Sequence, residues 1–322
     1  MDEKKQAGRR ILLFLAITFV ITYGIELLLI APMAGSTDIN KAMAAQWLIV
    51  GVMLVPTLGV ILTRLITKEG FSGKSLYLTI NLKNNLKYYA IVWPGFAALI
   101  AFGAVLYFLL FPSTFDGNMG YATAILNARS TTGHLTVEEV RQAMLMQIVI
   151  GVIFSPFANI IFGFGAEWGF RGYLLPKLLT CFHAVPAVLI DGLFWGLWHA
   201  PLVAVTGLNY GMGYVGYPAT GILAMCVFCV VIGIILSYVT IKAKSCVPAI
   251  LGNGMINGFA MIGVYFSSLE NPYNVFLGPA PTGLIGGAGF IVFAGYLLFK
   301  LYKEEKNTLQ FENQGDTIQK ES

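Results

Sequence analysis

Residues 165 to 176 read Gly-Ala-Glu-Trp-Gly-Phe-Arg-Gly-Tyr-Leu-Leu-Pro, and they place an acid and a base inside a stretch apolar enough to lie in a membrane. Glu167 and Arg171 are four residues apart, so a helix puts both side chains on one face, one turn apart. Ionisable groups inside a transmembrane segment are costly and by default mark a functional site. A structural ion pair that braces a helix bundle is the alternative interpretation of this stretch.

The composition of the whole chain indicates an integral membrane protein. Hydrophobic residues make up 57% of the 322 residues and charged residues only 11%, and the mean hydropathy is +0.74. Apolar runs of about 20 residues, the length that crosses a bilayer, recur along the chain. We therefore expect an all-α fold, a polytopic transmembrane helical bundle of about eight spans. Residues 1–302 form the expected single transmembrane domain, and residues 303–322 form an expected disordered cytoplasmic tail.

Hydropathy also predicts where these spans lie. The apolar run from about 143 to 179 is too long for one straight span and contains Pro156. We interpret Pro156 as a kink, with 157–178 crossing the core and an outer extension before it. A re-entrant segment is the alternative. The predicted spans are roughly 11–33, 43–66, 88–111, this long one ending near 178, 184–203, 219–241, 247–266 and 281–302.

Positive charge predicts the orientation of the bundle. Lysine and arginine gather on alternate connections between the predicted spans, whereas the other connections hold only Lys41, Arg129 and Arg141. The positive-inside rule then places the basic segments in the cytoplasm. We expect a multi-pass protein of the cell membrane with both termini cytoplasmic.

Three predicted spans carry polar residues at matched helical spacing. We estimate the depth of these residues by counting from the basic end of each predicted span, at about 1.5 Å per helical residue. They fall near the middle of a hydrocarbon core about 30 Å thick. Polar residues at one depth on separate helices favour a shared, hydrated cavity. The pairs are Glu167 with Arg171, Trp195 with His199, and Asn253 with Asn257.

Two further buried carboxylates accompany this set. Asp191 lies close to the predicted depth of Arg171, so it could compete with Glu167 for the guanidinium. Glu26 lies on the first predicted span, where the sequence suggests no partner for it.

The order and spacing of these residues resemble the CPBP family of intramembrane proteases, the CAAX protease and bacteriocin-processing group also called Abi. That family shows Glu-Glu-x-x-x-Arg, Phe-x-x-x-His and His-x-x-x-Asn motifs on three helices of an eight-helix bundle. Glu167 and Arg171 match the second Glu and the Arg, His199 matches the second motif with Trp195 at its Phe position, and Asn257 matches the third motif. The resemblance covers about residues 145–265.

Two positions depart from the family pattern. Ala166 stands where the family has its first Glu, and Asn253 stands where it has the His of the third motif. The resemblance implies that this Glu activates water beside the second-motif His, while the third-motif His and Asn stabilise the oxyanion; a metal role is also implied as an option. Alanine cannot take a proton, and Asn253 can donate a hydrogen bond but cannot shuttle a proton.

The resemblance therefore implies a protease fold with an impaired site. Our leading hypothesis is a pseudoprotease that binds a membrane-embedded peptide or protein partner, in regulation or in bacteriocin immunity or processing. The alternatives are an active or engineered-inactive endopeptidase for prenylated or leader-bearing peptides and, more weakly, a small-molecule transporter. We expect the lipid bilayer as surroundings, no nucleic acid, and no cofactor or metal here, although active relatives leave room for a divalent metal. The candidate site residues are Ala166, Glu167, Arg171, His199, Asn253 and Asn257.

Overall fold

The chain folds as a bundle of helices. The computed structural model describes the backbone of residues 3–129 and 133–321, and the side chains of these residues except 129 and 308–321. Within these ranges the backbone forms helices joined by turns and no β-strand, with one isolated bridge between Phe115 and Ser267. The predicted all-α class is confirmed.

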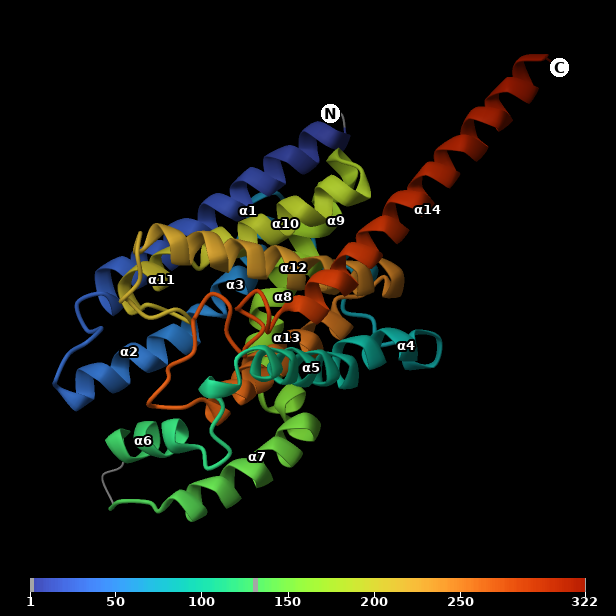
Figure 1. Cartoon of the computed structure of the whole chain (residues 1–322). Helices are drawn as coiled ribbons and strands as arrows, with labels where there is room; N and C mark the ends of the chain where they lie inside the picture. The colour runs from blue at the N-terminus through green and yellow to red at the C-terminus, as the bar shows by residue number, and fades with distance from the viewer. Residues whose placement is uncertain (1–2, 130–132, 322) are drawn as a thin grey trace.

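The helices follow the predicted spans in order (Figure 1). In the first half of the chain they are α1 (Glu3–Ile25), η1 (Glu26–Ile30), α2 (Ile39–Val52), α3 (Val55–Ile66), η2 (Gly73–Leu76), α4 (Leu82–Val92), α5 (Pro94–Leu110), η3 (Pro112–Thr114), α6 (Gly120–Arg129) and α7 (Val137–Ala158). In the second half they are α8 (Ile160–Gly169), η4 (Phe170–Leu174), α9 (Leu175–Cys181), α10 (Ala184–Trp198), α11 (Ala200–Thr206), α12 (Ala219–Ala243), α13 (Val247–Phe259), η5 (Ala260–Phe266) and α14 (Ala288–Glu321).

Several of these helices are long and apolar enough to cross a membrane. A further span results if α2 and α3, which meet at an angle of 46°, are counted as one bent crossing. The described residues thus contain six candidate membrane spans, or seven with the bent pair. This number agrees roughly with the predicted eight, and it identifies a multi-pass membrane protein. Among the described residues the six are Glu3–Ile30, Leu82–Leu110, Val137–Ala158, Ala184–Thr206, Ala219–Ala243 and Val247–Phe266.

The long apolar run differs from the prediction in where it breaks. Helix α7 continues through Pro156 to Ala158, and the break falls at Asn159, before α8 begins. A proline has no N–H to donate to the carbonyl four residues earlier. That carbonyl, of Val152, instead accepts a hydrogen bond of 2.7 Å from the indole Nε1 of Trp93. This partner compensates for the missing donor, so the predicted outer extension is itself a helix of span length.

The last span also begins later than predicted. Residues 281–287 form turns, and α14 starts at Ala288. A Cβ added at Gly286 would lie 2.1 Å from the carbonyl oxygen of Ala280, and one added at Gly103 on α5 would lie 1.8 Å from that of Gly286, so glycines allow both a tight turn and its close contact with α5. Helix α14 extends to Glu321, and since the side chains of 308–321 lie outside the described set, disorder of 303–322 stays a prediction.

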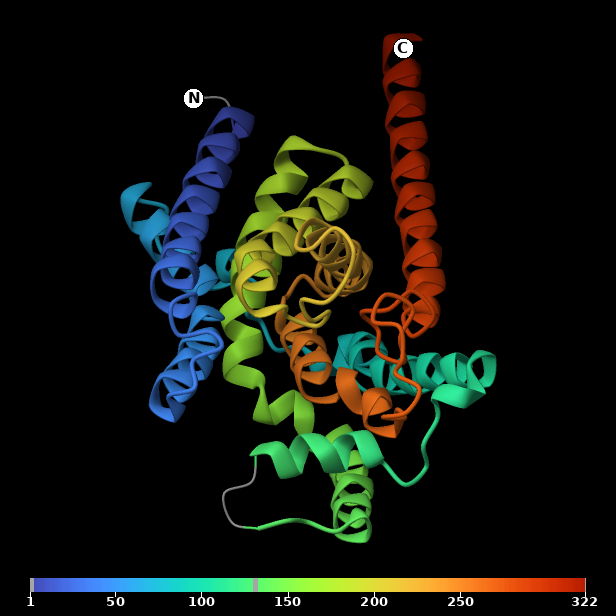
Figure 2. The same cartoon turned by 60° about the vertical axis from the view of Figure 1, so that its left-hand side comes forward.

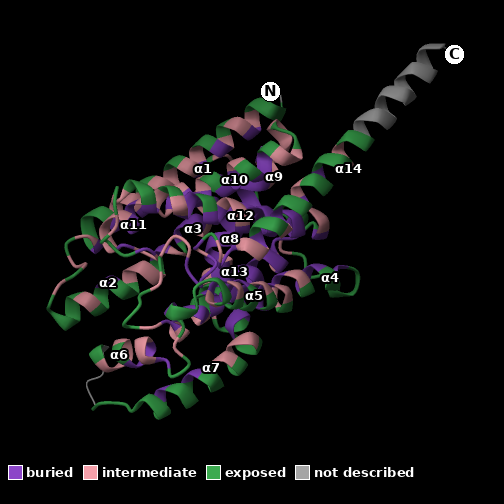
Figure 3. Ribbon diagram, in the orientation of Figure 1, coloured by how far each residue is buried: buried purple, intermediate pink, exposed green. Residues whose placement is uncertain are grey.

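Helices α8, α12 and α13 occupy the centre of the bundle. Figures 1 and 2 show α1 and α3 on one side of them, α14 on the other, and α6 with α7 projecting from one end. Buried residues concentrate on the central helices (Figure 3). Both figures also place the N-terminal end of α1 and the C-terminal end of α14 at the same end of the molecule.

Glycines let α13 approach its neighbours at backbone distance. A Cβ added at Gly163 on α8 would lie 2.5 Å from the carbonyl oxygen of Ile250, and one added at Gly254 would lie 2.7 Å from that of Pro156. Both distances are shorter than a carbon and an oxygen can approach. The contact brings the helices that carry Glu167 and Asn253 together.

We predict that Gly163→Ala destabilises the protein. The added methyl group meets backbone, which cannot move aside, and overpacking of this kind costs about 1–3 kcal/mol. The matched control is Gly51→Ala on α2, where a Cβ would meet nothing within 4 Å. The thermal unfolding midpoint in detergent should fall by about 2 °C or more for Gly163→Ala and stay level for the control. Equal midpoints for the two variants would show that the α8–α13 contact is loose.

Candidate active site

A buried guanidinium joins α8 to α10. Nη1 of Arg171, in η4, lies 3.0 Å from Oε1 of Glu167 on α8, and its Nε lies 3.1 Å from Oδ2 of Asp191 on α10. All three side chains are 0% exposed. The sequence suggested that the two acids compete for Arg171, but separate nitrogens bind them, so both contacts form together.

Two asparagines extend this cluster onto α13. Nδ2 of Asn253 donates to Oε1 of Glu167 at 2.7 Å, and Nδ2 of Asn257 donates to Oδ1 of Asn253 at 2.8 Å. Asn253 is buried, whereas Asn257 is exposed. A continuous polar chain thus runs from Arg171 through Glu167 and Asn253 to the surface.

Glu167 takes part in this series of hydrogen bonds through one carboxylate oxygen. Its Oε1 receives the contacts from both Arg171 and Asn253, and its Oε2 is buried without a hydrogen-bond partner among the described residues. The preceding residue, Ala166, is 0% exposed and contributes only a methyl group to the core. The first-motif position therefore carries no acid, and the neighbouring acid is held as part of an ion pair.

His199 stands apart from the carboxylate cluster. It connects α10 to α11, it is half-buried, and its ring packs 4.7 Å from that of Trp198. Its Nδ1 lies 2.9 Å from the carbonyl oxygen of Trp195. A carbonyl only accepts, so Nδ1 carries a proton and donates, which leaves Nε2 as the acceptor of a neutral ring. Among the described residues, no hydrogen bond joins His199 to Glu167 or Asn253.

Three residues around the guanidinium complete its surroundings. The ring of Trp195 lies 4.3 Å from the guanidinium carbon of Arg171, a cation–π contact. Oγ of Ser237 on α12 donates to Oδ2 of Asp191 at 3.2 Å. A Cβ added at Gly233 would lie 2.8 Å from Nη2 of Arg171. The guanidinium therefore fits against α12 because residue 233 has no side chain. Sequence reasoning missed the two α12 residues, although a glycine and a serine at helical spacing in an apolar span are a usable signal.

A divalent metal does not fit this set of side chains. The cationic guanidinium of Arg171 lies 3.0 Å from Glu167, where it would repel a second cation and already occupies the carboxylate. Among the described residues, no three His, Cys, Asp or Glu side chains gather as a ligand group. We therefore derive no chemistry through a metal.

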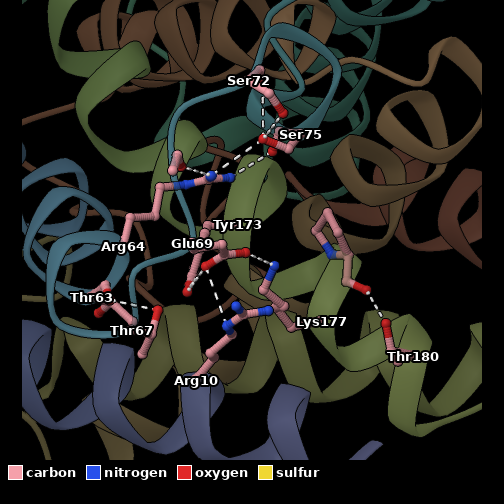
Figure 4. Close-up of polar contacts among 12 residues, drawn as sticks. Arg10, Thr63, Arg64, Thr67, Glu69, Ser72, Ser75, Tyr173, Lys177 and Thr180 are labelled. Carbon is pink, nitrogen blue, oxygen red and sulfur yellow. Dashed lines mark hydrogen bonds and ion pairs between the residues drawn. The ribbon is translucent and has the colours of Figure 1, made fainter. Parts of the chain in front are cut away.

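A second charged cluster holds the α9 end of the segment that carries Arg171 (Figure 4). Glu69, in the turn after α3, accepts a hydrogen bond of 2.8 Å from the hydroxyl of Tyr173 in η4. It also pairs with Lys177 on α9 and lies 3.5 Å from Nε of Arg10 on α1. Burial alone would raise the pKa of Glu69, but the ammonium of Lys177 and the Tyr173 hydroxyl outweigh it and hold the pKa below its usual value.

Arg64 fixes the loop beside this cluster. Its guanidinium donates to the carbonyl oxygens of Gly70 at 2.7 Å and Ser75 at 2.6 Å. The same group lies 5.4 Å from the ring of Tyr173. The loop after α3 is thereby tied to η4, which fixes the position from which Arg171 reaches the bundle centre.

The geometry defines a class of protein: a polytopic helical membrane protein in which the helices that carry the three polar motifs come together in the bundle. The family model described as type II CAAX prenyl endopeptidase Rce1-like matches residues 142–259, and this match supports the CAAX protease family for this part of the chain. The match includes all three motifs. No curated protein matches the chain.

We predict that Arg171→Met strongly destabilises the protein. The change leaves the carboxyls of Glu167 and Asp191 buried without a cation, and breaking a buried pair costs about 3–5 kcal/mol. The thermal unfolding midpoint in detergent should fall by about 10 °C. The variant that combines Arg171→Met with Glu167→Gln and Asp191→Asn should recover a large part of this loss.

The control for this prediction is Arg9→Met, which removes an exposed arginine of α1. It should leave the midpoint within about 1 °C, since surface substitutions change stability little. If Arg171→Met behaved like this control, the ion pairs would not brace the bundle.

We predict that the contribution of Glu69 to stability is lost in acid. Its pKa is lowered in the folded state, so the unfolded chain binds the proton more readily, at a pKa near 4.3. The stabilisation is complete above that value and disappears as the pH falls through the lower folded pKa. The difference in unfolding midpoint between the wild type and Glu69→Gln should be largest at pH 7 and shrink below about pH 4. A difference that stayed constant with pH would contradict this account.

Proposed function

We propose that this chain is a pseudoprotease, a CAAX-type intramembrane protease homologue whose proteolytic centre is disabled. The supporting observation is the state of Glu167, the acid that remains in the first motif. It is fully buried, and one oxygen is bound by Arg171 at 3.0 Å and by Asn253 at 2.7 Å. A general base has to reach a water molecule beside the substrate, and a carboxylate held in this way is a brace instead.

The remaining motif residues do not replace the missing base. His199 can accept a proton at Nε2, but Ala166 provides no acid to activate water with it. The amide of Asn253 donates to Glu167, and that of Asn257 donates to Asn253. Donors that are used within the cluster are not aimed at a developing oxyanion.

The retained part of the site supports a binding function. Asn257 keeps polar atoms at the exposed edge of the cluster, and His199 is a further half-buried polar side chain on the motif helices. Such a site suits a membrane-embedded peptide or protein whose polar backbone needs partners in an apolar environment. We place this function in regulation or in bacteriocin immunity or processing. We also propose that both termini are cytoplasmic, because they lie at one end of the molecule and the basic segments accompany them (Figures 1 and 2).

An active enzyme with rearranged chemistry is the second candidate. It is favoured by one observation: Oε2 of Glu167 has no hydrogen-bond partner among the described residues, so that oxygen is free to accept from water. In that case Glu167 and His199 would both be required for cleavage.

We predict that the purified full-length chain does not cleave peptides. In proteoliposomes, a farnesylated CAAX peptide and a leader-bearing peptide should be processed no faster by the wild type than by His199→Ala, because neither protein has a free acid to activate water. The double variant Ala166→Glu with Asn253→His restores the base and the imidazole, and it should cleave one of the two peptides. Product formation is followed by mass spectrometry.

Cleavage by the wild type that is lost in both Glu167→Gln and His199→Ala would overturn the pseudoprotease proposal in favour of the active enzyme. The binding part is tested separately with the same peptides carrying a fluorophore. We expect saturable binding that weakens in Asn257→Leu, with Asn271→Leu in the exposed loop as the matched control. Equal binding by these two variants would remove the proposed site.

A further inference from the structure

A basic groove lies between α4, α12 and α14, away from the motif residues. Its volume is about 280 Å³, and its wall carries Lys87, Lys242 and Lys300 together with Tyr88 and Tyr238. The three lysines come from three different helices. Lys242 lies in the last turn of α12, and the groove brings the other two lysines to the same level.

The lysines are concentrated around two tyrosine rings. Nζ of Lys242 and Nζ of Lys300 lie 5.8 and 5.7 Å from the centre of the Tyr238 ring, and Nζ of Lys87 lies 5.1 Å from that of Tyr88. The two rings are themselves 6.5 Å apart. Three ammonium groups therefore share a small volume, in which like charges repel one another.

One acid lines this groove, and it does not neutralise the three lysines. Glu304 forms an ion pair with Lys242. With three lysines and one glutamate, the groove keeps a net charge of +2. Such a groove attracts an anion, and its position at the end of the spans is the level of lipid headgroups.

An apolar groove continues from the basic one along the same helix. It lies between α5 and α14, has a volume of about 750 Å³, and is lined by side chains such as Leu99, Phe102 and Val292. Phe293 and Tyr296 line both grooves. The two therefore form one continuous channel, which is basic at the end that carries the lysines and apolar along the rest of its length.

The length of this channel corresponds to one lipid leaflet. Gly289, in the apolar groove, precedes Lys300 by eleven residues of α14, which is about 16 Å of helix. Half of a hydrocarbon core about 30 Å thick is about 15 Å. An acyl chain that starts at the lysines would thus end near the middle of the membrane.

We propose that this channel is a binding site for an anionic glycerophospholipid. Lys87, Lys242 and Lys300 hold the phosphate and headgroup, and an acyl chain lies between α5 and α14 against Phe102 and Val292. A zwitterionic lipid would fill the apolar groove but would not neutralise the lysines. A soluble phosphate would do the reverse. The site is independent of the pseudoprotease proposal, because it shares no residue with the motif cluster.

The test is native mass spectrometry of the purified full-length chain in detergent, titrated with dioleoylphosphatidylglycerol or dioleoylphosphatidylcholine. Each lysine near an anionic lipid contributes about a fivefold preference. The wild type should retain the anionic lipid at least about tenfold better than the zwitterionic one. The variant Lys87→Gln, Lys242→Gln, Lys300→Gln should lose this preference. The matched control is the exposed triple Lys74→Gln, Lys303→Gln, Lys306→Gln, which removes equal charge and should keep it.

A second pair of variants tests the apolar part of the channel. Val292→Trp fills the groove, whereas Leu109→Trp places the same ring on α5 outside it, and both positions are 74% exposed. Retention of the anionic lipid should fall in the first variant and not in the second. The proposal is wrong if the two lysine triples retain the lipid equally, or if the two tryptophan variants do. Displacement of the lipid by glycerol 1-phosphate at equal concentration would overturn it too, since it would assign the site to soluble phosphates.

Discussion

The guanidinium of Arg171 is the constraint on which the centre of the bundle depends. A cation in an apolar core is stable only if acids and other partners surround it, since each unpaired buried ion costs several kcal/mol. Glu167 and Asp191 meet this need from α8 and α10, and the Trp195 ring covers one face of the cation. The partners come from separate helices, so these helices can occupy only a narrow range of positions. The ion pairs thereby restrict the arrangement of the bundle together with the close glycine contacts of α13.

The same interaction explains what has happened to the motif site. A hydrolytic centre needs groups whose hydrogen-bonding capacity is kept for water and substrate. Here Asn253 donates to Glu167, Asn257 donates to Asn253, and Arg171 occupies the shared carboxylate oxygen. The amide at position 253 is used in an internal hydrogen bond, which is consistent with our proposal of a pseudoprotease. The cluster that results is suited to holding three helices together, and it explains how motif residues persist in this chain without the acid at position 166.

Much of this arrangement could be predicted from the sequence, and the rest depended on contacts between distant residues. Helical spacing was enough to pair Glu167 with Arg171, because that contact lies within one helical stretch. The break at Asn159 instead of Pro156 was not predictable, since it depends on an indole that α4 and α5 bring to the carbonyl of Val152. The late start of α14 follows from backbone contacts among glycines, which hydropathy does not register. Ser237 was missed for the same reason, as its role appears only once α12 lies against Asp191.

The space that α12 leaves at Gly233 links two positions that are far apart in the chain. Nη2 of Arg171 lies where a methyl group of residue 233 would begin. The guanidinium of Arg171 thus occupies the space next to Gly233 that a side chain at this position would need. A larger residue at 233 would push the guanidinium of Arg171 away from its present position, and so would disturb its contact with Asp191. Positions 171 and 233, which are far apart in the sequence, therefore constrain each other through a single contact.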